Sequence, residues 1–294
     1  DTALDLGAAV VDGQPHADTP VRVPLSVLNR HGLVAGATGT GKTKTLQLMA
    51  EQLSAQGVPV FLADVKGDLS GLAVPGEPND RITDRAGKVG QQWTPTGNPV
   101  ELLTLGGKGT GTPVRATVTS FGPTLLSKVL GLNDTQESSL GLVFHFADKQ
   151  GLALLDLKDL RELLNYLSKN AKDIGAKYGN VAQATVGSVQ RALLILENQG
   201  GAKFFGEPAL DINDLMKKDR EGYGYINILA ADKLMENPQL YATFLLWLMS
   251  ELFEQLPEVG DPEKPSLVFL PWPLLLPRVV CYTLFLSNRS KVGD

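Results

Sequence analysis

One eight-residue stretch restricts the possible folds of this chain more than any other feature. Residues 36–43 are Gly-Ala-Thr-Gly-Thr-Gly-Lys-Thr, and they fit the pattern G-x-x-x-x-G-K-[ST] at every fixed position. From the chain's own composition, roughly 0.02 accidental matches are expected. An apolar run, 32–35, precedes the pattern, and apolar residues then recur at helical spacing, at Leu46, Met49, Ala50 and Leu53. The sequence therefore predicts a strand, a glycine-rich loop and a helix in succession.

The composition of this loop is suited to binding phosphate. Glycines let the backbone wrap so that N–H groups face inward on an anion, and the start of a helix adds the positive end of its dipole. Lys42 can then reach the β- and γ-phosphates of a nucleotide, and the Thr43 hydroxyl can ligate Mg²⁺. We predict ATP and Mg²⁺ as ligands; the alternative is a glycine-rich turn with an exposed lysine. The predicted contact residues are Gly36, Ala37, Thr38, Gly39, Thr40, Gly41, Lys42, Thr43 and Lys44.

A second buried strand follows the helix, at Val58–Asp64. Strand, loop, helix and strand form a βαβ unit, which predicts an α/β fold with a mostly parallel sheet and helices on both faces. A dinucleotide-binding fold is a competing interpretation, because Asp64 lies 21 residues past Thr43, where a ribose-binding acid would fall. However, the loop lacks the third glycine of that fingerprint and has a lysine where small groups are needed.

The rest of the chain indicates a core interrupted by helices. Residues 65–113 are rich in Gly, Pro, Asp and Asn and resemble loops with short strands, whereas residues 123–198 are largely helical. We predict a short N-terminal β segment at 1–30 packed on the core, a nucleotide-binding core at 31–120 and 222–294, and a mainly helical insertion or lid at 121–221.

One segment has the length and composition of a membrane span. Ser266–Leu286 is mostly apolar, but it contains three prolines and Arg278. A lone helix in lipid tolerates these residues poorly, so the pattern favours a core strand followed by irregular chain. We therefore expect no membrane association.

Charge and cysteine content bear on partners and compartment. The chain has 27 Lys plus Arg against 32 Asp plus Glu, for a net charge of −5. This argues against a protein that coats nucleic acid through bulk charge, but allows a local basic channel or one assembled from several subunits. The single cysteine, Cys281, excludes an internal disulfide framework. Together with an N-terminus unlike a signal peptide, it predicts a cytoplasmic protein.

Acidic residues at the end of the second strand are candidates for magnesium binding and water activation. Asp64-Val65-Lys66-Gly67-Asp68 stands at the carboxyl end of the second strand, where ligands bind in parallel sheets. Asp64 or Asp68 could position Mg²⁺ or water, and Lys66 could contact phosphate or a neighbouring subunit. Simple turn chemistry explains the same residues equally well.

A P-loop hydrolase also needs an acid on a second strand, often followed by Glu. No run of four apolar residues followed by Asp-Glu occurs in this sequence. Leu152–Leu155 precedes Asp156, but we interpret Asp156 as the N-cap of a helix. The strand at 266–270 is followed by Pro271-Trp272 instead of acids.

Other chemistry-bearing residues give weaker signals. Arg115 and Arg191 are candidates for an arginine finger that reaches a neighbour's phosphate, although surface positions explain them too. The three histidines His16, His31 and His145 are scattered and, with one cysteine, do not predict a zinc site.

Several stretches together resemble a known family. Asn29–Ala35 leading into the P-loop, and Ala63–Ala73 after the second strand, resemble the HerA/FtsK superfamily of hexameric ATPases, with the best match to its HerA-like, YjgR-type bacterial branch. Further matching stretches lie at 132–137, 187–194, 204–208 and 250–257. The resemblance implies a RecA-like core, ATP with Mg²⁺, and a ring such as a hexamer with nucleotide between subunits. In the better-known members it implies double-stranded DNA as substrate.

The sequence departs from this family near its end. The family pattern continues the strand at 267–269 into an Asp-Glu pair, and a later strand carries a sensor glutamine, whereas residues 270–294 match neither. We therefore expect an ATP-hydrolysing ring motor on DNA, with Lys42, Asp64 and a neighbour's Arg191 as catalytic candidates. The alternatives are a nucleotide-binding switch or scaffold without efficient hydrolysis and, third, a monomeric nucleotide kinase.

Overall fold

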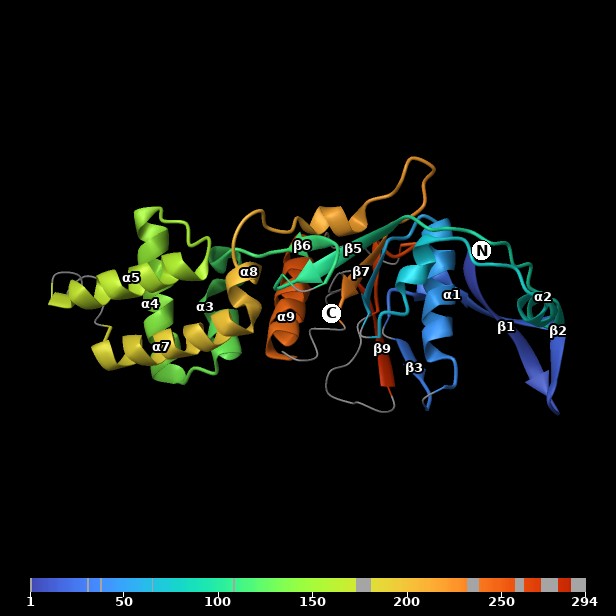
Figure 1. Cartoon of the computed structure of the whole chain (residues 1–294), viewed down its shortest axis with the longest axis horizontal. Helices are drawn as coiled ribbons and strands as arrows, with labels where there is room; N and C mark the ends of the chain where they lie inside the picture. Colours follow the sequence, from blue (N-terminus) through green and yellow to red (C-terminus); the bar gives the residue numbers. More distant parts are fainter. Residues whose placement is uncertain are drawn as a thin grey trace, which may run out of the picture. The chain divides into compact units, whose positions relative to one another are not determined.

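The computed structural model describes most of the chain in two compact units. The described residues are 2–30, 32–37, 39–64, 66–107, 109–172, 181–231, 238–256, 262–270 and 280–286. The core unit comprises Asp1–Leu103, Asp211–Asp232 and Leu252–Asp294. The helical unit comprises Thr104–Leu210 and Lys233–Glu251. The chain thus passes back and forth between the two units (Figure 1).

The principal sheet has seven strands in the order β3-β9-β8-β4-β7-β5-β6. Their bounds are β3 (Gly32–Ala35), β4 (Val60–Asp64), β5 (Val100–Leu105), β6 (Thr112–Val114), β7 (Ile226–Ala230), β8 (Leu267–Leu270) and β9 (Val280–Leu286). Strand β4 pairs in parallel with β7 and β8, and β5 pairs in parallel with β7. Strand β9 is antiparallel to both of its neighbours, β3 and β8. The mostly parallel α/β fold expected from the sequence is therefore confirmed.

The centre of this sheet is buried on both faces. Every residue of β4 and of β8 is buried. This explains why both strands, apart from Asp64 at the end of β4, are apolar throughout and show no alternation of polar and apolar residues. In adjacent strands, Phe61 and Phe269 are register partners, and their rings stack with centroids 4.7 Å apart.

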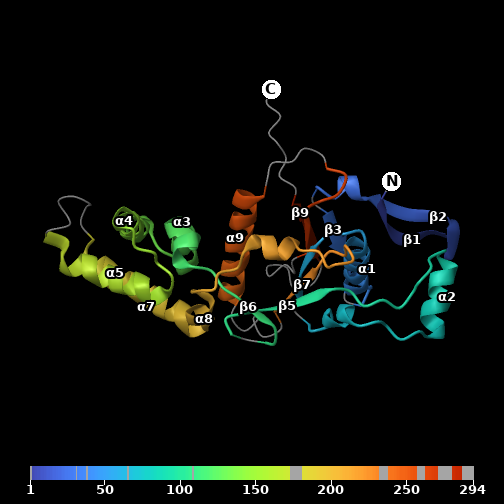
Figure 2. The ribbon, with the colours of Figure 1, turned by 90° about the horizontal axis from the view of Figure 1, so that it is seen from above.

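Helix α1 (Lys42–Ala55) covers one face of the core unit's sheet. The four residues predicted from the helical spacing are all buried, and they join a cluster with apolar residues of β4, β7 and β8. Figures 1 and 2 show α1 between the sheet and an N-terminal hairpin of β1 (Ala3–Val11) and β2 (Gln14–Pro24). The Gln52 side chain fixes the hairpin to α1: its Oε1 accepts from Asp5 N at 2.7 Å and its Nε2 donates to Asp5 O at 2.8 Å.

The prediction that only loops and short strands follow β4 is wrong in one part. Residues 65–113 contain a helix, α2 (Asp80–Lys88), in addition to loops and strands. It begins where the Asn79 side chain accepts from Ile82 N, and Asp80 lies in its first turn. None of its residues is buried. Its apolar side chains, Ile82 and Ala86, lie four residues apart and are partly buried, but a nine-residue segment is too short to establish a helical period from the sequence. Short 3₁₀ segments of the core unit lie at Leu25–Val27, Ser70–Ala73 and Ile212–Met216.

The helical unit contains several helices and a group of aromatic side chains. The helices are α3 (Val118–Leu130), α4 (Asp134–Gln150), α5 (Leu157–Lys169), α7 (Gln183–Leu196), a π-helical turn at Glu197–Gly201, α8 (Ala202–Phe204) and α9 (Pro238–Gln255). Of these, α3, α4 and α5 have side-chain N-caps. Asp156 is the N-cap of α5, as predicted, and forms a capping box with Asp159. The Phe204 ring lies within 6.3 Å of the rings of Phe121, Phe244 and Trp247.

The long apolar segment near the end contains strands. Its first part forms β8, as expected from the sequence, and its last part forms β9. Residues 271–279 lie outside the described residues. Among the helices that the structure describes, none is both long enough and apolar enough to cross a membrane.

Candidate nucleotide-binding site

The glycine-rich loop joins the end of β3 to the start of α1. Gly39 and Gly41 have φ angles of 82° and 95°, in the left-handed region that favours glycine. Gly41 is also the N-cap residue of α1. It offers no side chain to the first-turn N–H groups, and no acidic residue lies in that turn. These N–H groups therefore remain available to an anion, where the helix dipole is also favourable.

Lys42 closes this loop on itself. Its Nζ donates to the carbonyl oxygens of Gly36 and Ala37, at 2.7 Å each. The Thr40 hydroxyl donates to the same Ala37 oxygen at 2.8 Å. A Cβ on Gly36 would lie only 2.4 Å from Thr40 Oγ1, so only glycine fits there unless the hydroxyl moves. The loop is thus held in shape by its own lysine and threonine.

Thr43 and Lys44 are the last of the predicted nucleotide-contact residues. Thr43 is half-buried in the first turn of α1, and its hydroxyl makes no hydrogen bond within the described part of the chain. A free hydroxyl oxygen beside a phosphate site suits Mg²⁺, which keeps several waters and takes few protein ligands. Lys44 is exposed, and its Nζ donates to Gln47 Oε1 at 2.9 Å. Thr38 lies outside the described residues.

Asp64 ends β4 and is only 4% exposed. Its Oδ1 accepts from the backbone N–H groups of Lys66, Gly67 and Asp68 at 3.1, 2.7 and 3.2 Å, and its Oδ2 accepts from Leu69 at 2.9 Å. Each carboxylate oxygen has about two lone-pair positions, so backbone donors use Oδ1 fully, whereas Oδ2 accepts one bond from the described residues. In this arrangement Asp64 holds the backbone of residues 66–69. Its predicted role with Mg²⁺ or water would fall to Oδ2, or would require that bonds to Oδ1 open.

A hollow of about 320 Å³ lies beside the P-loop helix within the core unit. Lys44, Gln47 and Glu51 line it from one face of α1, opposite Trp93 and the buried Asn98. Burial raises the pKa of Glu51. Glu51 and Trp93 are not among the site residues predicted from the sequence. The spacing of three and four residues from Lys44 to Gln47 to Glu51 is the signal that would have placed Glu51 near the loop.

The candidate arginines belong to the helical unit. Arg191 is exposed on α7, and its Nη2 donates to Ser188 Oγ at 3.0 Å. Arg115 donates from Nη1 to the carbonyl oxygen of Glu207 at 2.8 Å. Their role as a neighbour's arginine finger stays a prediction. In the part of the chain that the structure describes, which excludes His31, no group of three or more His, Cys, Asp or Glu residues could hold a metal ion.

Fold and loop together define a P-loop nucleotide-binding protein of the α/β class. A family model described as "Helicase HerA-like C-terminal" matches residues 10–271. The chain belongs to this family, and the resemblance to the HerA/FtsK type of P-loop ATPase is confirmed. The match ends one residue after β8, where the sequence departs from the family pattern. A search of curated proteins found no match.

Two solved structures of a coupling protein share the fold, and a third structure is a weaker match. The plasmid coupling protein TrwB in complex with ADP and Mg²⁺ has 16% sequence identity and a TM-score of 0.50, covering 90% of this chain and 60% of that one. The unbound monoclinic form of the bacterial conjugative coupling protein TrwBΔN70 has 16% identity, a TM-score of 0.51, and coverage of 92% and 58%. VirB4 of Thermoanaerobacter pseudethanolicus has 15% identity, a TM-score of 0.47, and coverage of 88% and 66%. The chain therefore spans about 60% of the length of these proteins.

Proposed function

We propose that this chain binds ATP with Mg²⁺ at residues 36–44 and hydrolyses it as one subunit of a ring-shaped DNA motor. The observation that carries this proposal is the loop itself: an α1 N-terminus without a side-chain cap, with the Lys42 ammonium poised at the loop's own carbonyl oxygens. Membership of the HerA-like family supports it, and so does the ADP with Mg²⁺ in the TrwB structure of the same fold.

The described contacts suggest how ATP would enter. The Lys42 Nζ leaves the carbonyl oxygens of Gly36 and Ala37 and turns to phosphate oxygens, which accept charged hydrogen bonds more strongly. The first-turn N–H groups of α1 bind the same phosphates. Thr43 offers its hydroxyl to Mg²⁺, which neutralises charge on the phosphate oxygens. We assign no residue to water activation, because Asp64, the acidic candidate, already binds four backbone N–H groups of its own loop.

A second candidate function is a nucleotide-dependent switch or scaffold without efficient turnover. Two observations favour it: the carboxylate of Asp64 binds four backbone N–H groups of its own loop, and Pro271-Trp272 follow β8 where the family has Asp-Glu. Such a chain would bind ATP through the same loop and release no phosphate. The two candidates therefore differ in hydrolysis and agree on binding.

Phosphate release from ATP, measured with and without duplex DNA, separates these functions. Turnover that rises with DNA supports the motor. ATP binding without phosphate release at any protein concentration refutes the motor and supports the switch. Asp64→Asn is the informative variant: if Asp64 acts only in the loop, turnover falls no further than the loss of folded protein measured on the same sample by circular dichroism.

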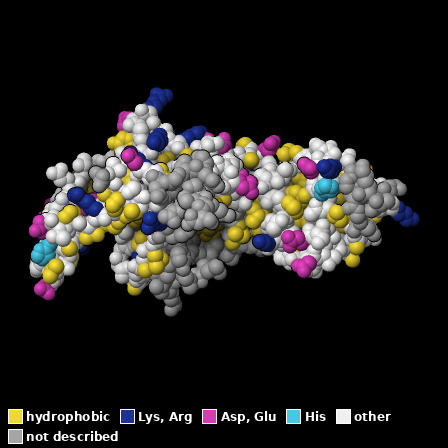
Figure 3. Space-filling view, turned by 180° about the vertical axis from the view of Figure 1, so that it is seen from behind, with side chains coloured by type: hydrophobic (Ala, Val, Ile, Leu, Met, Phe, Trp, Pro, Cys, Tyr) yellow, Lys and Arg dark blue, Asp and Glu magenta, His cyan; other side chains and the backbone are white. Residues whose placement is uncertain are grey.

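Ring assembly and DNA binding need separate tests. The net charge of −5, and the Lys and Arg side chains that lie singly on the face drawn in Figure 3, favour a DNA channel shared by several subunits. We therefore expect sedimentation to show an oligomer with ATP and Mg²⁺, and duplex DNA to bind that oligomer. A chain that stays monomeric with ATP and transfers phosphate to a small acceptor would instead be a kinase. A cytoplasmic location is part of the same proposal.

A further inference from the structure

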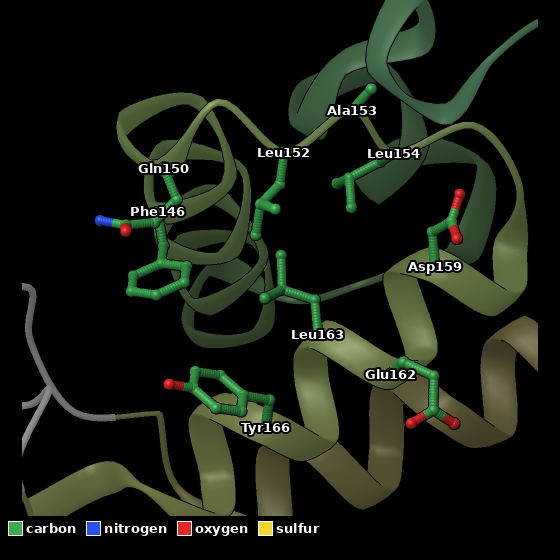
Figure 4. A pocket seen from close by; sticks show the side chains of 9 residues that line it. All are labelled: Phe146, Gln150, Leu152, Ala153, Leu154, Asp159, Glu162, Leu163 and Tyr166. Carbon is green, nitrogen blue, oxygen red and sulfur yellow. The ribbon is translucent and has the colours of Figure 1, made fainter.

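The helical unit contains a hollow of about 580 Å³ that the ATPase proposal leaves without a role. It lies between the end of α4, the connection after Gly151, and α5 (Figure 4). Its lining comes entirely from the helical unit: Phe146, Gln150, Leu152, Ala153, Leu154, Asp159, Glu162, Leu163 and Tyr166. Ligand pockets in proteins have volumes of about 300–1,000 Å³, so the hollow can take one or two large side chains.

One face of α5 is directed into this hollow. Asp159, Glu162, Leu163 and Tyr166 follow one another at three- and four-residue spacing, which places them in one row on the helix. Other residues of α5 are buried in the core of the helical unit: Leu157, Leu160, Leu164 and Leu167. The row that faces the hollow therefore includes side chains that the core does not require.

Apolar surface is left exposed at this place. The exposed fractions of Leu152 and Tyr166 are 49% and 51%, although both are large apolar side chains. The Tyr166 ring lies 6.2 Å from the ring of Phe146, and Figure 4 shows the two rings together at one end of the hollow. Leu152 and Leu163 lie between this end and the other. Large apolar side chains that stay half exposed beside a cavity are typical of a binding site.

The other end of the hollow is acidic. Figure 4 shows Asp159 and Glu162 there, and no Lys or Arg is among the lining residues. The Asp159 Oδ2 accepts from the backbone N–H groups of Leu155 and Asp156 at 2.8 and 3.2 Å. The exposed Glu162 carboxylate forms no hydrogen bond or ion pair within the described residues. An apolar hollow with a free carboxylate at one end is complementary to an apolar group joined to a cation.

We propose that this hollow is the docking site for a peptide segment of another protein, in which a bulky apolar side chain lies next to Lys or Arg. The apolar side chain enters between Leu152, Leu163 and Tyr166. The basic side chain pairs with Glu162. This inference goes beyond the proposed ATPase, because it concerns the helical unit and involves none of residues 36–44.

The probe is a panel of fluorescein-labelled decapeptides measured by anisotropy against the whole chain. Each contains one Leu, Ile, Phe or Trp with two Lys or Arg residues within four positions. Matched peptides replace the basic residues by Glu, or the apolar residue by Ser. We expect binding from a subset of the basic-apolar peptides and from neither matched set.

Two pairs of variants locate the binding site. Leu152→Ser removes an apolar wall, whereas Leu155→Ser removes an exposed leucine of the same connection that does not line the hollow. Glu162→Gln removes the free charge, and Glu221→Gln removes an exposed charge of the core unit. We expect Leu152→Ser to weaken binding about 10-fold. Glu162→Gln should weaken it about 3-fold and reduce its salt dependence. Neither control should change binding.

Three results would each overturn the proposal. The proposal fails if the best peptides bind all four variants equally, or if the Glu-containing peptides bind as well as the basic ones. It also fails if Leu152→Ser changes the sedimentation of the chain alone, because the occupant is then a second copy. Thermal melts of each variant exclude loss of folding as the cause, and unchanged ATP binding separates the result from the fate of the ATPase proposal.

Discussion

Substitution of Lys42 by alanine tests whether the loop is a phosphate site or a glycine-rich turn with an incidental lysine. Without nucleotide, the variant loses two charged hydrogen bonds of 2.7 Å, to Gly36 O and Ala37 O. Both bonds are near solvent, so we expect a modest loss of stability, about 1 kcal/mol. For a chain of this size that lowers the melting temperature by about 2–4 °C.

The effect on ATP binding should be much larger. In the bound state, the Lys42 ammonium exchanges carbonyl oxygens for charged phosphate oxygens. Hydrogen bonds between charged partners contribute about 1.5–3 kcal/mol each. After subtraction of the bonds given up in the free loop, two such bonds leave a net loss of about 3 kcal/mol, or roughly 100-fold in affinity.

Isothermal titration calorimetry with ATP and Mg²⁺ measures this loss directly. Lys88→Ala is the control, because Lys88 is an exposed lysine of the same core unit, on α2 and outside residues 36–44. We expect the control to bind ATP within about 3-fold of the parent chain. If Lys42→Ala binds ATP as tightly as the parent chain does, the loop is not the phosphate site and the proposed function is refuted.

Three further substitutions test the surrounding structure. Gly36→Ala forces the Thr40 hydroxyl, 2.4 Å from the new Cβ, out of its bond to Ala37, so ATP affinity should fall while the urea midpoint changes little; equal affinity would show that the loop adapts. Asp64→Ala leaves four backbone N–H groups without their acceptor, and we expect urea titration to show a loss of about 2–4 kcal/mol. For Glu51, burial raises the pKa above its ordinary value of 4.5, so the charged form costs stability at neutral pH. Glu51→Gln should therefore be more stable than the parent chain at pH 7, and the difference should disappear as the pH falls below about 4.5; a difference that is constant with pH would contradict this reasoning.

The parts of the fold that could be predicted are those set by local spacing. The burial of Leu46 and Leu53 on α1 and the capping of α5 by Asp156 follow from neighbours within one or two helical turns. The insertion of β9 between β3 and β8 could not be predicted, because strand order depends on pairing between distant segments. Helix α2 was missed because its nine residues contain too few apolar side chains to establish a helical period.

The candidate site also has parts that could be predicted from the sequence and parts that could not. The residues of the loop at 36–44 are identified by a pattern in which each type has a defined task. The role of Asp64 depends on whether the backbone after it folds over the carboxylate or away from it, and the residue types permit both. The hollow of the helical unit was not predicted, because its two sides come from α4 and α5 and no motif marks their approach.

The strand order also has a consequence for how the chain folds as it is synthesised. Strand β4 is paired on one side with β7 and on the other with β8, and Val60 meets Ile226 and Val268 as register partners. Both partners leave the ribosome long after β4, and the whole stretch Thr104–Leu210 of the helical unit is made in between. That stretch is rich in local helical contacts, which form quickly, whereas the closing of long loops around β4 is slow. The helices should therefore become compact first, while both edges of the apolar strand β4 are still unpaired. Unpaired apolar strand edges are prone to aggregation, so the core is the part of the nascent protein most in need of a chaperone.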